Sequence, residues 1–233
     1  MQPKIVDKKE WMKQREALLA AEKAFTHERD ALSAKRREMP WVRVDRSYTF
    51  QGPDGEVSLS DLFNGRGQLI VYHLMFAPEW EWACKNCSFW ADQFDGAVPH
   101  LNARDTSFVA ISRAPLEKLQ RQAKRLGWKF PWVSAEKNRF AYDFGFSFES
   151  DDKDALYNFG RKPHPGMTDL PGFSIFSMGE DGQIYLTFNV QGRGQDITNS
   201  AYNMLDFTAK GRDEDSLPNP MAWVKLHDEY QRA

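Results

Sequence analysis

Cysteine is scarce in this sequence: only two of its 233 residues, Cys84 and Cys87, are cysteines. A disulfide-rich secreted scaffold is therefore excluded, and a site built from four cysteine thiolates cannot form within one chain. Both cysteines belong to a single C-x-x-C motif, with Lys85 and Asn86 between them. The function has to be sought first in this motif.

The sequence also lacks a long apolar run and an excess of charge of either sign. Its longest apolar stretch, 69–77, includes His73 and has nine residues, whereas a membrane-spanning helix needs about 20. The first thirty residues contain no apolar segment typical of a signal peptide. With 31 basic and 33 acidic residues, the formal net charge is -2, which disfavours a nucleic-acid binder. We therefore expect a cytoplasmic protein that binds neither membranes nor nucleic acids.

The N-terminal segment has the pattern of one long helix, 7–38. Trp11, Leu18, Phe25 and Leu32 recur every seven residues and form a narrow apolar seam among charged residues. This seam has to pack against something, because most helical stability in water comes from packing. We predict a homodimer in which this helix contributes to the interface; the alternative is a helix that braces its own domain.

Strand and helix patterns alternate after this helix. The predicted elements are a strand ending at 48–50, a strand at 57–59, a central strand at 69–76, a helix at 88–94, a strand at 107–111, a helix at 116–126, a strand at 130–133, a hairpin of 173–176 and 184–188, and a helix at 198–207. Alternating β and α units produce a mainly parallel sheet. A βαβ half followed by a hairpin and a helix is the thioredoxin plan, here with an N-terminal hairpin as in its peroxiredoxin-like branch.

These elements divide the chain into three predicted parts. They are an N-terminal helical arm at 1–40, a thioredoxin-like α/β domain at 41–211, and a C-terminal tail with a short helix at 212–233. The polar segment 147–170, which contains proline and glycine, is expected to be an insertion loop within the domain.

The C-x-x-C motif follows the most apolar strand and opens a helix. The N-terminal end of a helix stabilises a thiolate, so Cys84 is the candidate nucleophile. The three-residue spacing puts Cys87 on the same helix face, where it can resolve a mixed disulfide. Lys85 adds positive charge, whereas Glu79 and Glu81 oppose thiolate formation. The motif predicts a thiol–disulfide oxidoreductase without a cofactor, acting on a protein or small-molecule disulfide or thiol and recycled by an external thiol reductant or oxidant.

Other interpretations of the cysteine pair stay open. Two reduced, buried cysteines can serve as small apolar side chains. Two C-x-x-C motifs that meet across a dimer could bind zinc, although we predict no metal site within one chain. A binding module of the same fold, without catalysis, is therefore the alternative to an enzyme.

The sequence resembles one family over nearly its whole length. The segment 82–92, WACKNCSFWAD, is similar to the signature of a bacterial family of thioredoxin-like proteins, catalogued as domain of unknown function 899 and described as predicted dithiol–disulfide oxidoreductases. Further similar segments are 100–105, 112–115, 127–134, 142–144, 170–174, 193–194 and 205–206, together with the Trp11 helix and Tyr72-His73. The resemblance implies a thioredoxin-like fold and a dithiol–disulfide activity.

Four residues are candidates for substrate binding. Leu170 and Pro171 precede a hairpin strand, the place at which thioredoxin-like proteins have a cis-proline loop that faces the cysteines and holds the substrate backbone. Trp80 and Trp82 lie in the loop before Cys84, where exposed indoles can shape a groove beside the sulfur atoms.

Three more residues are candidate auxiliary groups: His73, Lys85 and Arg193. His73 lies beside Leu74, which aligns with the acidic residue that thioredoxins carry beneath the cysteines. Arg193 could serve as a positive partner of a thiolate, although a surface arginine is its alternative. Peroxiredoxins place a Thr or Ser before the reactive cysteine, and Glu81 occupies that position here. A thiol peroxidase is therefore ranked below the oxidoreductase.

Overall fold

The computed structural model describes residues 3–149, 151–152, 154–160, 163 and 166–230. The chain divides into two compact units, with the boundary between Pro40 and Trp41. The first unit is the helix α1 (Lys8–Arg37), which confirms the predicted long helix. The Asp7 carboxylate caps this helix by accepting a 2.8 Å hydrogen bond from the backbone N–H of Glu10. Its last turn carries Lys35, Arg36 and Arg37, which complement the helix dipole.

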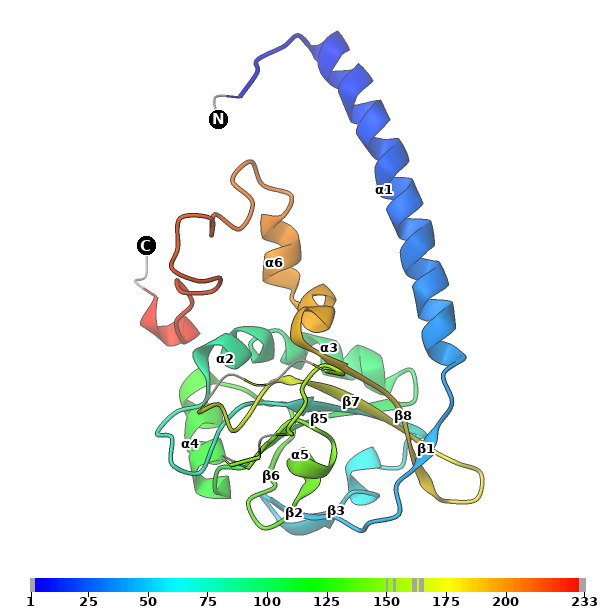
Figure 1. Cartoon of the computed structure of the whole chain (residues 1–233), viewed down its shortest axis with the longest axis vertical. Coiled ribbons are helices and arrows are strands. Elements are labelled where there is room, and N and C mark those ends of the chain that lie inside the picture. The colour runs from blue at the N-terminus through cyan, green and yellow to red at the C-terminus, as the bar shows by residue number, and fades with distance from the viewer. Residues whose placement is uncertain (1–2, 150, 153, 161–162, 164–165, 231–233) are drawn as a thin grey trace. The chain divides into compact units, whose positions relative to one another are not determined.

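The second unit is built on one eight-stranded sheet in the order β1-β8-β7-β4-β5-β6-β2-β3 (Figure 1). The strands are β1 (Val42–Arg43), β2 (Thr49–Gly52), β3 (Gly55–Ser58), β4 (Gln68–His73), β5 (Thr106–Ser112), β6 (Trp132–Ser134), β7 (Gly172–Met178) and β8 (Ile184–Gln191). Strand β4 pairs in parallel with β5 and antiparallel with β7, which in turn pairs antiparallel with β8. The order β8-β7-β4-β5 with these directions is the thioredoxin arrangement, and the hairpin β2–β3 extends the sheet beyond β6.

Helices cover both faces of the sheet. The helices of this unit are α2 (Lys85–Ala91), α3 (Phe94–Asn102), α4 (Leu116–Leu126), α5 (Phe140–Asp143) and α6 (Ser200–Leu205), with the 3-10 turns η1 (Asp61–Phe63), η2 (Gly192–Thr198) and η3 (His227–Glu229). One core lies between the sheet and α2, α3 and α4, and a second lies on the opposite face with η1 and α5 (Figure 1). Residues of β4 contribute to both cores, which explains why this strand is apolar on both faces.

Several boundaries differ from the sequence prediction. The central strand ends at His73 and not at 76, because the chain turns toward α2 from Leu74 onward. Among its described residues, the tail forms the short turn η3 in place of the predicted amphipathic helix, after a run of turns that contains Pro218 and Pro220. The segment 147–170 is closed at its base by a bridge between Ser147 and Asp169. Parts of that predicted loop, and the last residues of the tail, lie outside the described residues.

Within the part of the chain that the structure describes, none of the helices has the length and apolar character that crossing a membrane requires.

Candidate functional site

The two cysteines lie where the chain passes from β4 into α2. Cys84 is the N-cap residue of α2, and its backbone N–H donates a 2.9 Å hydrogen bond to the carbonyl of Met75, two residues beyond the end of β4. Both thiols are free. Cys84 is partly exposed, whereas the side chain of Cys87 is buried. The site therefore combines one partly exposed cysteine with one buried cysteine.

The Cys84 thiol is acidic for a cysteine. A hydrogen bond with the Cys87 thiol lowers the pKa of Cys84 to about 7, and the backbone N–H groups of Cys87 and Asn86 and the charge of Lys85 act in the same direction. Burial opposes this shift, because it disfavours the charged thiolate. These amides are the free donors of the first turn of α2, as expected for a thiolate at a helix N-terminus. The lowered pKa brings formation of the Cys84 thiolate close to neutral pH.

Cys87 has the opposite character. Burial raises the pKa of the Cys87 thiol well above its ordinary value, and the hydrogen bond to Cys84 and the charge of the Cys84 thiolate raise it further. Hydrogen bonds from the Met75 backbone and from the Tyr72 side chain partly offset this effect. The pair is thus asymmetric: Cys84 is the ready nucleophile, and Cys87 is a protonated thiol held directly behind it.

A buried glutamine on α4 fixes the start of the cysteine helix. The Gln122 side-chain carbonyl accepts a 2.7 Å hydrogen bond from the backbone N–H of Ala83, and its amide donates to the hydroxyl of Ser88 at 3.2 Å. Ser88 in turn donates to the Cys84 carbonyl at 3.0 Å. Gln122 is not among the site residues predicted from the sequence. The available signal was a polar residue on the apolar stripe of α4, between Leu119 and Leu126.

Helix α4 also holds the loop that contains the two predicted groove tryptophans. The Lys118 ammonium donates to the carbonyl of Pro78 at 2.7 Å and to that of Trp80 at 2.8 Å. Trp80 is partly buried against the core beneath α2. The guanidinium groups of Arg121 and Arg125 lie 4.7 Å and 4.6 Å from the centroid of the Trp82 ring. Trp82 is thereby anchored on α4 by cation–π contacts.

The segment of Leu170 and Pro171 lies beside the strand that leads to the cysteines. Strand β7 begins at Gly172, which pairs with His73 at the end of β4. The Leu170–Pro171 peptide bond is trans, so the expected cis-proline loop is not formed. The Pro171 carbonyl accepts a 2.8 Å hydrogen bond from the Tyr157 hydroxyl, and the Leu170 N–H donates to the Phe146 carbonyl at 2.8 Å. A side chain at Gly172 would collide with Val190 and Phe146, which explains the glycine.

His73 faces away from the cysteines. Adjacent residues of a strand point to opposite faces of a sheet, and Tyr72, not His73, lies on the side of α2. The His73 ring stacks on Phe146 with a centroid distance of 3.7 Å, and its Nε2 lies 3.0 Å from the Ser174 hydroxyl. Burial lowers the pKa of His73 to about 3, so its ring is neutral at physiological pH. The structure thus separates this predicted auxiliary group from the pair.

The two predicted basic groups differ in their relation to the pair. Lys85 is exposed, its ammonium lies 3.5 Å from the Ala222 carbonyl, and its charge lowers the pKa of Cys84. Arg193 forms a 3.1 Å ion pair with Asp196, and 86% of its side chain is exposed. Arg193 is therefore a surface arginine, the alternative that the sequence left open.

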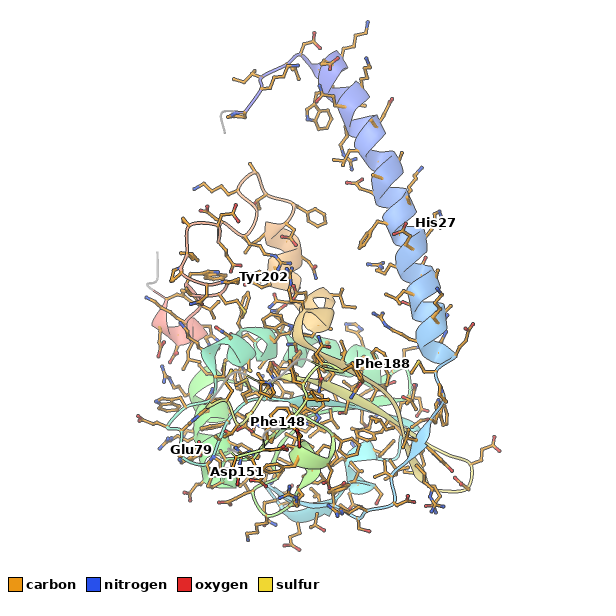
Figure 2. The ribbon with its side chains drawn as sticks, in the orientation of Figure 1. His27, Glu79, Phe148, Asp151, Phe188 and Tyr202 are labelled. Carbon is orange, nitrogen blue, oxygen red and sulfur yellow. The ribbon has the colours of Figure 1, made fainter. Side chains whose placement is uncertain are left out.

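The C-terminal part of the chain packs on the outer face of α2. The ring of Phe89 contacts those of Tyr202 and Trp223, with centroid distances of 5.3 Å and 5.4 Å. Figure 2 shows Tyr202 above α2, whereas Glu79, in the loop before Cys84, lies at the outer side of the body. The His227 ring lies 2.7 Å from the Asp92 carboxylate at the end of α2. The C-terminal part of the chain therefore covers the outer face of α2.

Among the described residues, no three or more His, Cys, Asp or Glu side chains are grouped so that they could hold a metal ion. Cys84 and Cys87 therefore have no third ligand of these types from the described part of the same chain.

No curated protein matches this chain at a significant level. Similar solved structures include peroxidoxin BcpB from Mycobacterium tuberculosis, with 15% identity and a TM-score of 0.46 over 70% of this chain and 94% of that chain. They also include a PrxQ mutant from Xylella fastidiosa, with 13% identity and a TM-score of 0.46 over 70% of this chain and 95% of that chain.

The family comparison covers almost the whole sequence, including both cysteines, Gln122 and the Leu170–Pro171 segment. The matching profile spans residues 1–230, and its description is "Bacterial protein of unknown function (DUF899)". The chain belongs to this family of bacterial proteins.

Proposed function

We propose that this protein is a thiol–disulfide oxidoreductase that uses Cys84 as its nucleophile and Cys87 as its resolving residue. The observation that carries the proposal is the asymmetry of the pair at the start of α2. A partly exposed cysteine whose thiol pKa is about 7 lies next to a buried cysteine whose thiol pKa is raised. A purely structural pair of buried cysteines has no need for such a difference.

The proposed reaction has two steps. The Cys84 thiolate attacks one sulfur atom of a substrate disulfide, so that a mixed disulfide forms and the first substrate thiolate leaves. The Cys87 sulfur then attacks the Cys84 sulfur, the bond between Cys84 and the substrate breaks, and the second substrate thiol leaves with the proton of Cys87. Two electrons pass from the protein dithiol to the substrate, and an external thiol reductant restores the pair. The reverse sequence oxidises a dithiol substrate.

The proposed substrate is a protein or small-molecule disulfide that approaches along Leu170 and Pro171. This segment precedes β7, whose first residue pairs with the last residue of β4. The opposite approach, over the outer face of α2, is occupied by Tyr202 and Trp223. Trp80 lies in the loop between β4 and Cys84 and is our candidate for an apolar contact with the substrate. We place this chemistry in the cytoplasm, where thiol reductants recycle dithiols.

The test is a redox titration of the purified full chain in glutathione and dithiothreitol buffers, read out by thiol alkylation and mass. We expect one intramolecular disulfide, with a potential between about -120 and -300 mV. The variants Cys84→Ser and Cys87→Ser are matched controls that keep the size of the side chain and lose the disulfide. A pair that does not oxidise in this range contradicts the proposal.

Metal analysis of protein purified without oxygen separates the remaining alternative. Stoichiometric zinc that is lost in Cys84→Ala would favour a metal-holding pair shared between two chains. Fast formation of a peroxide-dependent sulfenic acid at Cys84 would instead favour a thiol peroxidase.

A further inference from the structure

The side chain of Tyr72 carries a polar hydroxyl into the apolar core. It is fully buried, and its ring packs against Phe94 and Phe173 with centroid distances of 5.0 Å and 4.8 Å. A phenylalanine would satisfy these ring contacts equally well. Burying the additional hydroxyl has a cost unless it forms hydrogen bonds. The partner of this hydroxyl is therefore informative.

The Tyr72 hydroxyl points at Cys87. It lies 3.3 Å from the Cys87 carbonyl, which is long for a hydrogen bond between two oxygen atoms. That carbonyl belongs to α2, where it can already accept a helical hydrogen bond. The same hydroxyl also acts on the sulfur atom, since a hydrogen bond from the Tyr72 side chain lowers the pKa of the Cys87 thiol. A tyrosine hydroxyl rotates freely about its C–O bond, so its proton can turn from the carbonyl to the sulfur atom.

We propose that Tyr72 is the positioning residue for the resolving step, in which its hydroxyl donates a hydrogen bond to the sulfur of Cys87 as that sulfur becomes the attacking thiolate. This inference rests on the proposed function. While Cys87 is protonated, the hydroxyl donates to the carbonyl; when the thiol proton leaves, it donates to the sulfur. Tyr72 itself stays protonated throughout, because burial raises the pKa of its hydroxyl well above the ordinary value.

Few other groups can take this role. The resolving sulfur faces Cys84 on α2, the backbone N–H of Met75 and the Tyr72 hydroxyl on β4. Once Cys84 carries the substrate in a mixed disulfide, its thiolate charge is gone and the two donors remain. The Tyr157 hydroxyl, which helps to raise the pKa of Tyr72, is itself bound to the Pro171 carbonyl at 2.8 Å.

The test uses Tyr72→Phe in the full chain and the aromatic disulfide 5,5′-dithiobis(2-nitrobenzoate). Attack by Cys84 releases the first thionitrobenzoate and leaves the second on Cys84; attack by Cys87 then releases the second. The first phase measures the nucleophile and the second measures the resolving step. Tyr48→Phe is the matched control, because it removes the hydroxyl of a buried tyrosine that binds Asp143 on the other face of the sheet.

We expect the first phase of Tyr72→Phe to keep its rate and its pH profile. Loss of a hydrogen bond to a charged group should reduce the fraction of Cys87 that is thiolate by about tenfold or more. The remaining Cys87 thiolate is more basic and therefore more nucleophilic, which compensates in part. We therefore expect the second phase to slow about five- to tenfold, with its pH midpoint shifted to a higher pH. Tyr48→Phe should leave both phases unchanged.

A second phase that is unaltered in Tyr72→Phe overturns the inference, whereas a wild-type protein without a second phase contradicts the proposed function itself. A second measurement leaves residue 72 intact. Ionisation of Cys87 in Cys84→Ser strengthens the hydrogen bond from Tyr72, so a tyrosine absorption band should shift with the same midpoint as the thiolate band. A tyrosine spectrum that does not change through this titration also overturns the inference.

Discussion

The side-chain carbonyl of Gln122 lies 2.7 Å from the backbone nitrogen of Ala83, the residue that precedes the nucleophile Cys84. Gln122 is fully buried, and its amide donates at the same time to Ser88, one turn into α2. A single side chain of α4 therefore holds the segment that enters the cysteine helix and the first turn of that helix. The position of Cys84 depends on a contact between residues that are far apart in the sequence.

We predict that Gln122→Ala destabilises the protein and disturbs Cys84. The substitution leaves the Ala83 N–H and the Ser88 hydroxyl without this partner in a buried place, at a cost of about 1–3 kcal/mol for each unsatisfied group. Urea denaturation should show a loss of the free energy of unfolding of about 2–4 kcal/mol. The control is Gln120→Ala on the exposed face of the same helix, for which we expect a change within about 0.5 kcal/mol. Equal stabilities of the two variants would contradict the role of Gln122.

The reactivity of Cys84 should follow pH with a midpoint near 7, since the pKa of its thiol is lowered to about 7. The rate of alkylation should fall below that midpoint, where the thiolate is protonated, and reach a plateau above it. Cys87→Ala removes the largest cause of the shift, so the midpoint should rise toward the ordinary cysteine value of about 8.5. Cys87→Ser keeps a hydroxyl donor and should lie between the two. An unchanged midpoint in Cys87→Ala would show that the backbone amides and Lys85 keep the pKa of Cys84 low without the Cys87 thiol.

A prediction about stability follows from His73. Its pKa is lowered to about 3 by burial, so the unfolded chain binds a proton below about pH 6.5 while the folded protein does not. The contribution of neutral His73 to the free energy of unfolding is therefore fully present above pH 6.5 and is lost as the pH falls toward 3. The loss approaches about 1.4 kcal/mol per pH unit in that window. His73→Phe, which keeps an aromatic ring beside Phe146, should make the decline less steep by this amount in denaturation at several pH values.

The control for this experiment is His100→Phe, which places the same side chain at an exposed position of α3. Equal slopes for the wild type and His73→Phe between pH 6.5 and 3 would mean that the His73 ring takes up its proton in the folded protein.

Much of the fold could be predicted from the sequence because its signals are local. The apolar run that forms β4, the Gly127 stop of α4 and the turn between β7 and β8 each report on a few neighbouring residues. The thioredoxin order then follows from the alternation of strands and helices. The position of Cys84 at the start of α2 was accessible for the same reason.

The surroundings of the cysteines were less accessible. Strand β4 is apolar on both faces, so its sequence did not tell which of Tyr72 and His73 faces α2. The structure selects Tyr72. Gln122 binds the backbone of Ala83, which is 39 positions away in the sequence, and no local pattern indicates such a contact. The hydrogen bonds that Leu170 and Pro171 form with Phe146 and Tyr157 likewise join separate segments of the chain, and no local pattern indicates them.

Our last prediction concerns the apolar seam of α1, which a single helix cannot cover by itself. We propose that the full chain is a homodimer and that the seam contributes to its interface, because burying such a seam is what stabilises a long helix in water. Leu18→Glu and Phe25→Glu together place two carboxylates in the seam, and sedimentation at micromolar concentration should then show a monomer. The matched control is Ala20→Glu with His27→Glu, since a rotation of about 100° per residue puts both on the opposite face of the helix (Figure 2 labels His27). This control should remain dimeric. A wild-type chain that sediments as a monomer would show that α1 is instead an intramolecular brace.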